Sequence, residues 1–129
     1  MYERTMEMKK KNGALKISIS VGGWNHASKG FSDVVASEAN MKKFVDQSIA
    51  FMRENGFDGL DMDWEYPGVA SRGSKPGHKH AFTVLIQKLR AVSFLNSRGA
   101  CGRGAGGPAD CGCVACRPTD GCRYLIDNR

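Results

Sequence analysis

One segment of the chain reads Asp58-Gly59-Leu60-Asp61-Met62-Asp63-Trp64-Glu65 and alternates carboxylates with large apolar side chains. Residues two apart in a β-strand share a face, so Asp61, Asp63 and Glu65 are expected to point the same way. The residues between them are expected to point to the opposite face, against covering helices: Leu60, Met62 and Trp64. The segment therefore predicts a strand that is polar on one face and buried on the other.

Three carboxylates side by side are costly to bury unless partners or function maintain them. Neighbouring carboxylates cannot all be ionised comfortably, so they are expected to share a proton at neutral pH. Glu65 stands at the C-terminal end of the strand, where the active sites of βα barrels lie. We therefore interpret Glu65 as a general acid.

Two alternatives for the acidic segment are less favoured. A metal site is one, but the segment lacks the glycine and the spacing of a calcium loop, and Met62 and Trp64 favour a strand. A solvent-facing structural strand is the other, but the large apolar residues indicate helices on one side. No metal and no cofactor are expected here.

The flanking sequence predicts strands alternating with helices. Residues 1–12 are polar and expected to be helical, and Leu15 to Val21 alternate as in a strand. Ser37 is a plausible N-cap for a helix with an apolar stripe, and Gly56 is placed to end that helix. After a Gly68–Gly77 loop, a last helix is expected, with these residues on one apolar face: Phe82, Leu85, Ile86, Leu89 and Val92.

This order predicts an α/β fold in which a right-handed crossover places two parallel strands side by side. With 129 residues, 41% hydrophobic and 25% charged, the chain has the composition of a soluble globular protein. No apolar run is long enough for a membrane span, and the first residues do not read as a secretory signal. The net charge of +6 comes without an aromatic-basic patch, so no nucleic-acid partner is expected.

Residues 97–129 differ sharply from residues 1–96, because they hold all five cysteines and no lysine. We expect this segment to be an irregular tail, disordered or artefactual, such as a vector scar or translation past a frameshift or an intron; a separate module is the alternative. Its Cys111, Cys113, Cys116 and Cys122 offer four thiolates for zinc, but the spacing matches no ordinary paired site.

Two motifs carry a resemblance to a known family. Asp58–Glu65 resembles the Asp-x-x-Asp-x-Asp-x-Glu signature of glycoside hydrolase family 18, the chitinases and chitinase-like proteins, and Tyr66-Pro67-Gly68 continues the match. Ser20-Val21-Gly22-Gly23-Trp24 resembles the family's other motif, at the end of the preceding strand. The resemblance covers about Lys10 to Val92, and it looks most like the animal and fungal chitinase branch.

The resemblance implies hydrolysis of chitin or chito-oligosaccharides by a substrate-assisted mechanism that retains configuration. In it, Glu65 protonates the leaving oxygen, and Asp63 orients the substrate's acetamido group, whose carbonyl attacks the anomeric carbon. Asp61 pairs with Asp63 and holds its proton, while Asp58 is more structural. The family also implies secretion and action outside the cell.

The other motif residues are assigned around this acid cluster. Trp24 and Tyr66 resemble sugar-contacting aromatics, with a core position as the alternative for Trp24. Gly22 and Gly23 are expected to let another group come close to the backbone. Gly23 is expected to lie beside the substrate. Ser20 is expected to face the barrel interior and to hydrogen-bond near the acidic cluster.

A complete (β/α)8 barrel needs about 250 residues. The sequence therefore predicts a fragment of a TIM barrel, about strands three and four with their helices, in residues 1–96. Two family residues have no match in residues 97–129: the tyrosine that supports the acetamido group and the tryptophan that forms the floor of the −1 sugar subsite. Two hypotheses remain open: an active chitinase segment, or a catalytically silent chain that at most binds chitin oligosaccharides. The oligomeric state is left open.

Overall fold

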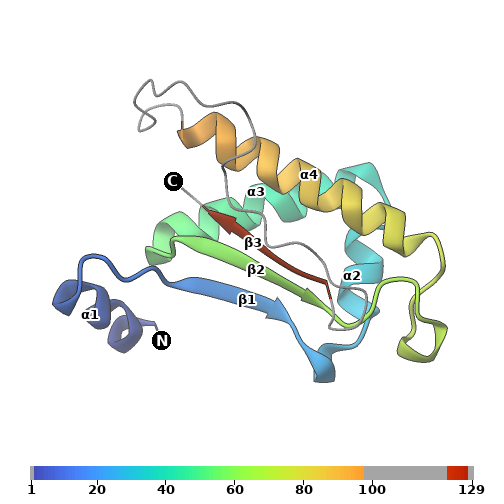
Figure 1. Ribbon diagram of the computed structural model, residues 1–129. Coiled ribbons are helices and arrows are strands. Elements are labelled where there is room, and N and C mark those ends of the chain that lie inside the picture. The colour runs from blue at the N-terminus through green and yellow to red at the C-terminus, as the bar shows by residue number, and fades with distance from the viewer. Residues whose placement is uncertain (1, 98–121, 128–129) are drawn as a thin grey trace, which may run out of the picture.

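The described residues form a three-stranded sheet with helices packed on one of its faces (Figure 1). The computed structural model describes residues 2–97 and 122–127. In chain order the elements are α1 (Glu3–Lys11), β1 (Ser18–Gly22), η1 (Trp24–His26), α2 (Lys29–Val34), α3 (Glu38–Asn55), β2 (Gly59–Trp64), η2 (Ala70–Arg72), α4 (His78–Ser97) and β3 (Cys122–Asp127).

The strands β1 and β2 run parallel and side by side, as predicted, with the register running from Ser18 opposite Gly59 to Gly22 opposite Asp63. The connection between them contains α2, which the sequence analysis did not predict, and the long helix α3. Ser37 caps α3, since its Oγ accepts a hydrogen bond of 3.1 Å from the Asn40 N–H. The mixed α/β architecture of the prediction is confirmed.

The strand β3 pairs antiparallel with β2, from Gly59 opposite Asp127 to Trp64 opposite Cys122. It lies in the segment that the sequence predicted to be irregular. Pairing with a strand more than fifty residues away is a tertiary event, which local pattern alone does not reveal. The predictions for Cys101 to Cys116 lie outside the described residues.

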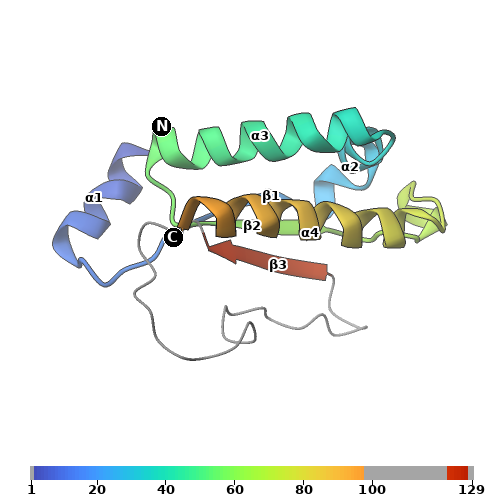
Figure 2. The same cartoon turned by 90° about the horizontal axis from the view of Figure 1, so that it is seen from above.

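The core lies between the sheet and the helices α3 and α4, which cover the same face (Figure 2). The apolar face of β2 is fully enclosed, because Leu60, Met62 and Trp64 are at most 2% exposed. Burying side chains of this size contributes about 1.5–3 kcal/mol each to folding. They pack against two helical stripes: Met41, Val45, Ile49 and Met52 of α3, and Phe82, Leu85, Ile86 and Leu89 of α4.

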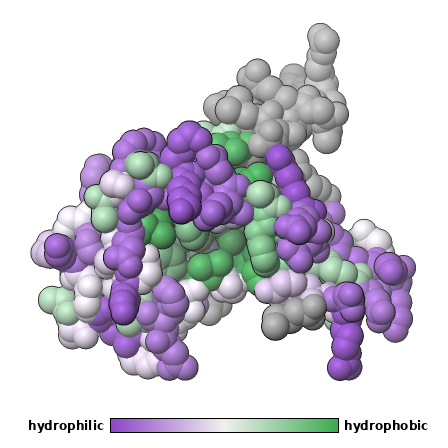
Figure 3. Space-filling view, turned by 180° about the vertical axis from the view of Figure 1, so that it is seen from behind, coloured by the Kyte–Doolittle hydropathy of each residue, from purple (hydrophilic) through white to green (hydrophobic). Residues whose placement is uncertain are grey.

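The strand β1 forms one edge of the sheet formed by the described residues. A hollow beside it is lined mostly by apolar residues of β1, β2 and α3 (Figure 3): Ile19, Val21, Phe44, Gln47, Ser48, Phe51 and Leu60. A parallel strand is normally covered on both sides, so an open edge of this kind matches a partial barrel. No helix in the described part of the chain is long and apolar enough to cross a membrane.

Candidate functional site

The acidic residues follow the predicted alternation along β2. Asp61 and Asp63 lie on the face opposite the helices, and Glu65 comes directly after the last residue of the strand. Asp63 is only 5% exposed, while Asp61 and Glu65 are half-buried. The structure therefore places Asp61 and Asp63 on one face of β2 and Glu65 directly after the C-terminal end of this strand, which pairs in parallel with β1.

The turn after β1 lies directly against the acidic strand. The Gly23 N–H donates a hydrogen bond of 2.8 Å to the Asp63 carbonyl oxygen. Gly22 has a φ of +117°, and a Cβ at this position would lie 2.0 Å from the same oxygen. At Gly23, an added Cβ would lie 3.9 Å from Asp63 Oδ2. The two motifs, forty residues apart in sequence, thus form one continuous surface around Asp63.

Ser20 lies opposite Asp61 in the parallel register. Asp61 Oδ1 is buried, and it has no hydrogen-bond partner in the part of the chain that the structure describes. The predicted hydrogen bond from Ser20 to the cluster stays a prediction. A buried oxygen without a hydrogen-bond partner lowers the stability of the folded protein. Residues that carry such an atom are often maintained for function.

Trp64 holds the end of the acidic strand in place. Its ring stacks on Phe31 at a centroid distance of 4.9 Å, and it meets Phe82 edge-on at 5.3 Å. Its Nε1–H donates a hydrogen bond of 2.8 Å to Ser28 Oγ, and both side chains are fully buried. Because Trp64 stands between Asp63 and Glu65, this anchor fixes the backbone that carries both carboxylates. Ser28 lies outside both motifs, and no sequence signal pointed to it.

The two motif aromatics lie at the same end of the sheet as Glu65. Trp24 is 59% exposed, which does not support the alternative of a core position. Tyr66 is half-buried, and the peptide bond that joins it to Glu65 is cis. The structure adds Arg72, which the sequence analysis missed: its guanidinium lies over the Trp24 ring and bonds to the Glu65 carbonyl.

Asp58 lies at the opposite end of β2, away from Glu65. Its Oδ2 accepts a hydrogen bond of 2.8 Å from the Ile17 N–H and lies 2.9 Å from Lys9 Nζ. Burial raises the pKa of Asp58, but the Ile17 N–H and the Lys9 and Lys16 ammonium groups outweigh it and bring the pKa below its ordinary value. These contacts support the predicted structural role.

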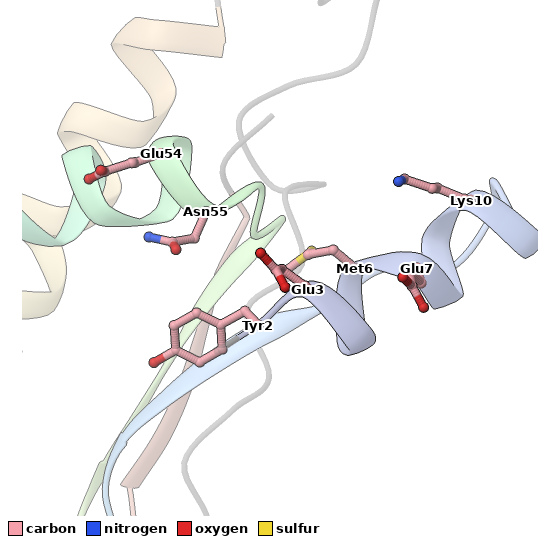
Figure 4. Close-up of a pocket in the computed structure, with 7 residues that line it drawn as sticks. All are labelled: Tyr2, Glu3, Met6, Glu7, Lys10, Glu54 and Asn55. Atoms are coloured by element: carbon pink, nitrogen blue, oxygen red, sulfur yellow. The ribbon is translucent and has the colours of Figure 1, made fainter.

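A second hollow lies between α1 and the end of α3 (Figure 4), lined by Tyr2, Glu3, Met6, Glu7, Lys10, Glu54 and Asn55. The charged groups of this hollow do not point to a common centre. Among the described residues, no group of three or more His, Cys, Asp or Glu side chains could hold a metal ion. The acidic strand remains the candidate site.

Comparison with known proteins agrees with this geometry. A family model described as "Glycosyl hydrolases family 18" matches residues 1–100. Chitotriosidase-1 of Mus musculus is 45% identical over 89 residues, which cover 69% of this chain and 19% of that protein. Putative chitinase 1 of Margaritifera margaritifera is 44% identical over 90 residues, covering 70% of this chain. The chain thus spans 19% of the length of these curated relatives.

Solved structures of similar fold include both enzymes and non-enzymes. Chitinase ChiA74 from Bacillus thuringiensis matches with a TM-score of 0.67 and 42% identity, covering 77% of this chain and 16% of its own. Human YKL-39, described as a pseudo-chitinase with retained chitooligosaccharide binding, matches with a TM-score of 0.66 and 32% identity, over 79% of this chain and 26% of its own. The matched segment therefore occurs in proteins that cleave chitin and in one that binds its fragments.

Proposed function

This chain belongs to glycosyl hydrolase family 18, and we propose that its acidic strand is the catalytic segment of a site that hydrolyses β-1,4 linkages between N-acetylglucosamine units. The observation that carries the proposal is the position of Glu65: it follows the C-terminal end of β2, a strand that pairs in parallel with β1 and carries Asp61 and Asp63 on the face opposite the helices. Active sites of βα barrels lie at this end of the strands.

Each carboxylate has a separate task in the proposed mechanism. Glu65 donates a proton to the glycosidic oxygen as the bond to the anomeric carbon breaks. The substrate's own acetamido carbonyl oxygen bonds to that carbon and forms an oxazolinium ion, which Asp63 orients and stabilises. Glu65 then takes a proton from water, whose oxygen opens the ring with retained configuration. Asp61 pairs with Asp63 and holds its proton.

The depth of the cluster supports this division of tasks. Asp63 is the most buried of the three and lies beneath the Gly22–Gly23 turn, so a group held by it is shielded from bulk water. Glu65 is more open, as a group that exchanges protons with water needs to be. Trp24 and Tyr66 are the proposed sugar-contacting aromatics, since Tyr66 adjoins Glu65 and Trp24 follows the neighbouring parallel strand at the same end of the sheet.

A second candidate function is binding without hydrolysis. Human YKL-39 shows that a related fold can be a pseudo-chitinase and still bind chitooligosaccharides. The intact Glu65 favours hydrolysis, and the match to Human YKL-39 keeps binding alone as the second candidate. In either case we propose chitin or its oligosaccharides as the partner, with action outside the cell.

The test is the release of a fluorescent label from a chitotrioside by the purified chain. We expect hydrolysis that disappears in Glu65→Gln, with saccharide binding retained, because the amide keeps the shape of the side chain but cannot donate the proton. Glu54→Gln is the matched control, since Glu54 is exposed on α3, and it should leave the rate unchanged. Binding without hydrolysis in the parent chain would establish the second candidate.

A further inference from the structure

Arg72 connects the two motif loops, although it belongs to neither motif. It lies in η2, within the loop from β2 to α4. Its Nε donates a hydrogen bond of 3.0 Å to the Glu65 carbonyl oxygen, and its Nη2 donates one to the Trp24 carbonyl oxygen. Its guanidinium carbon lies 3.9 Å from the centroid of the Trp24 ring. One side chain therefore contacts the backbone of both loops, the one after β1 and the one after β2, and also the exposed ring of Trp24.

The chemistry of arginine suits this threefold contact. A guanidinium is planar and always charged, so it can donate in its plane to two carbonyls while its flat surface stacks on an indole. Lysine offers a single charged centre and no plane, and glutamine offers no charge. The contact is therefore specific to the residue type, beyond its net charge.

The loop that carries Arg72 is itself well braced. The Arg72 N–H donates to the Val69 carbonyl at 3.0 Å, and Gly73 closes the turn with a φ of +74°. Ser74 Oγ accepts a hydrogen bond of 2.8 Å from the Gly68 N–H, and Ser74 is 3% exposed. Arg72 is half-buried in this frame, so its side chain is fixed before any ligand arrives.

From this arrangement we infer that Arg72 is a positioning residue for carbohydrate: it holds the Trp24 ring as a fixed platform at a set distance from Glu65. Trp24 is 59% exposed, so most of its surface stays open while the guanidinium covers part of the ring. A pyranose that packs on an already ordered ring loses less conformational entropy at binding. The inference rests on the proposed function, because it assumes that the ligand is a chitin oligosaccharide.

The experiment compares the parent chain with Arg72→Gln, Arg72→Lys and the charge-matched control Arg53→Gln, whose exposed side chain lies on α3. Circular dichroism checks that each variant is folded. Two readouts follow: acrylamide quenching of tryptophan fluorescence, which reports Trp24 because Trp64 is 0% exposed, and titration with chitohexaose. Trp24→Ala, alone and combined with Arg72→Gln, completes the series.

We expect Arg72→Gln to raise the quenching constant and to weaken chitohexaose affinity by about tenfold, the effect of losing one good charge-assisted contact. Arg72→Lys should recover only part of the affinity, and Arg53→Gln should change neither readout. In the Trp24→Ala background, Arg72→Gln should have no further effect on affinity, because the ring that it positions is gone.

Several results would overturn the inference. One is an unchanged quenching constant and chitohexaose affinity in folded Arg72→Gln. Another is an equal loss of affinity in Arg53→Gln, which would indicate charge attraction alone. The third is an affinity loss from Arg72→Gln that is just as large in the Trp24→Ala background. If Arg72→Gln does not fold, full recovery by Arg72→Lys would overturn it. A parent chain that binds no chitohexaose contradicts the proposed function and the carbohydrate part of the inference, whereas the quenching constants still decide whether Arg72 holds the ring.

Discussion

The N–H of Gly23 donates a hydrogen bond of 2.8 Å to the carbonyl oxygen of Asp63. This bond joins the turn after β1 to the acidic strand, backbone to backbone, at the residue that carries the most buried of the three carboxylates. The approach depends on the absence of a side chain at Gly22, where a Cβ would lie 2.0 Å from the Asp63 carbonyl oxygen. Three predictions concern how β1 and β2 are held in place at their two ends.

The first prediction concerns Gly22→Ala. A Cβ there would lie 2.0 Å from the Asp63 carbonyl oxygen and 2.9 Å from Phe31 Cε2, at a φ of +117°. Backbone strain and overpacking together should lower the free energy of unfolding by about 2–5 kcal/mol, measured by urea denaturation. Gly73→Ala is the control: its φ is +74° but nothing lies within 4 Å, so about 1–2 kcal/mol is expected. Equal losses in both variants would contradict the close contact at Asp63.

The second prediction concerns Asp58→Asn, which weakens the bond from Ile17 and removes the ion pairs with Lys9 and Lys16. A loss of about 1.5–3 kcal/mol is expected at neutral pH. Asp46→Asn removes an exposed pair with Lys42 and should cost at most about 1 kcal/mol.

The same variant has a defined pH dependence. Since the folded-state pKa of Asp58 lies below its ordinary value, the unfolded chain takes up this proton first as the pH falls. The stabilisation from Asp58 is therefore fully present above about pH 4 and is lost as the pH falls through the folded-state pKa. Urea denaturation at a series of pH values should show the difference between the parent and Asp58→Asn shrinking on acidification. A difference that stays constant below pH 4 would contradict the pairing.

The third prediction concerns Ser28→Ala, which leaves the Nε1–H of Trp64 buried without its 2.8 Å partner. Destabilisation of about 1–3 kcal/mol is expected in urea denaturation. In a Trp64→Phe background the same change should cost much less, because the donor is absent. Ser71→Ala, at an exposed position in η2, should be close to neutral. A Ser28 effect that persists in full beside Phe would show that the hydrogen bond is not its cause.

Local pattern was enough for the main elements. The alternation from Asp58 to Glu65 predicted β2 and the face of each side chain, because the β-strand period of two assigns faces directly. Ser37 and Gly56 predicted the ends of α3, because capping depends on a few neighbouring backbone groups. By contrast, α2 and β3 were not predicted. The helix α2 is only six residues long, too short for a clear period, and β3 depends on the free edge of β2.

The sequence by itself determined which residues are chemically special: the carboxylates of the acidic strand, the glycines of the turn and the two aromatics of the motifs. Only the tertiary structure decided how they are held. Ser28 beneath Trp64, and Arg72 between Trp24 and Glu65, belong to no motif, because their contacts join residues 36 and 48 positions apart. Contacts of that range follow from the packing of whole elements, and neither periodicity nor composition encodes them in any short stretch of the chain.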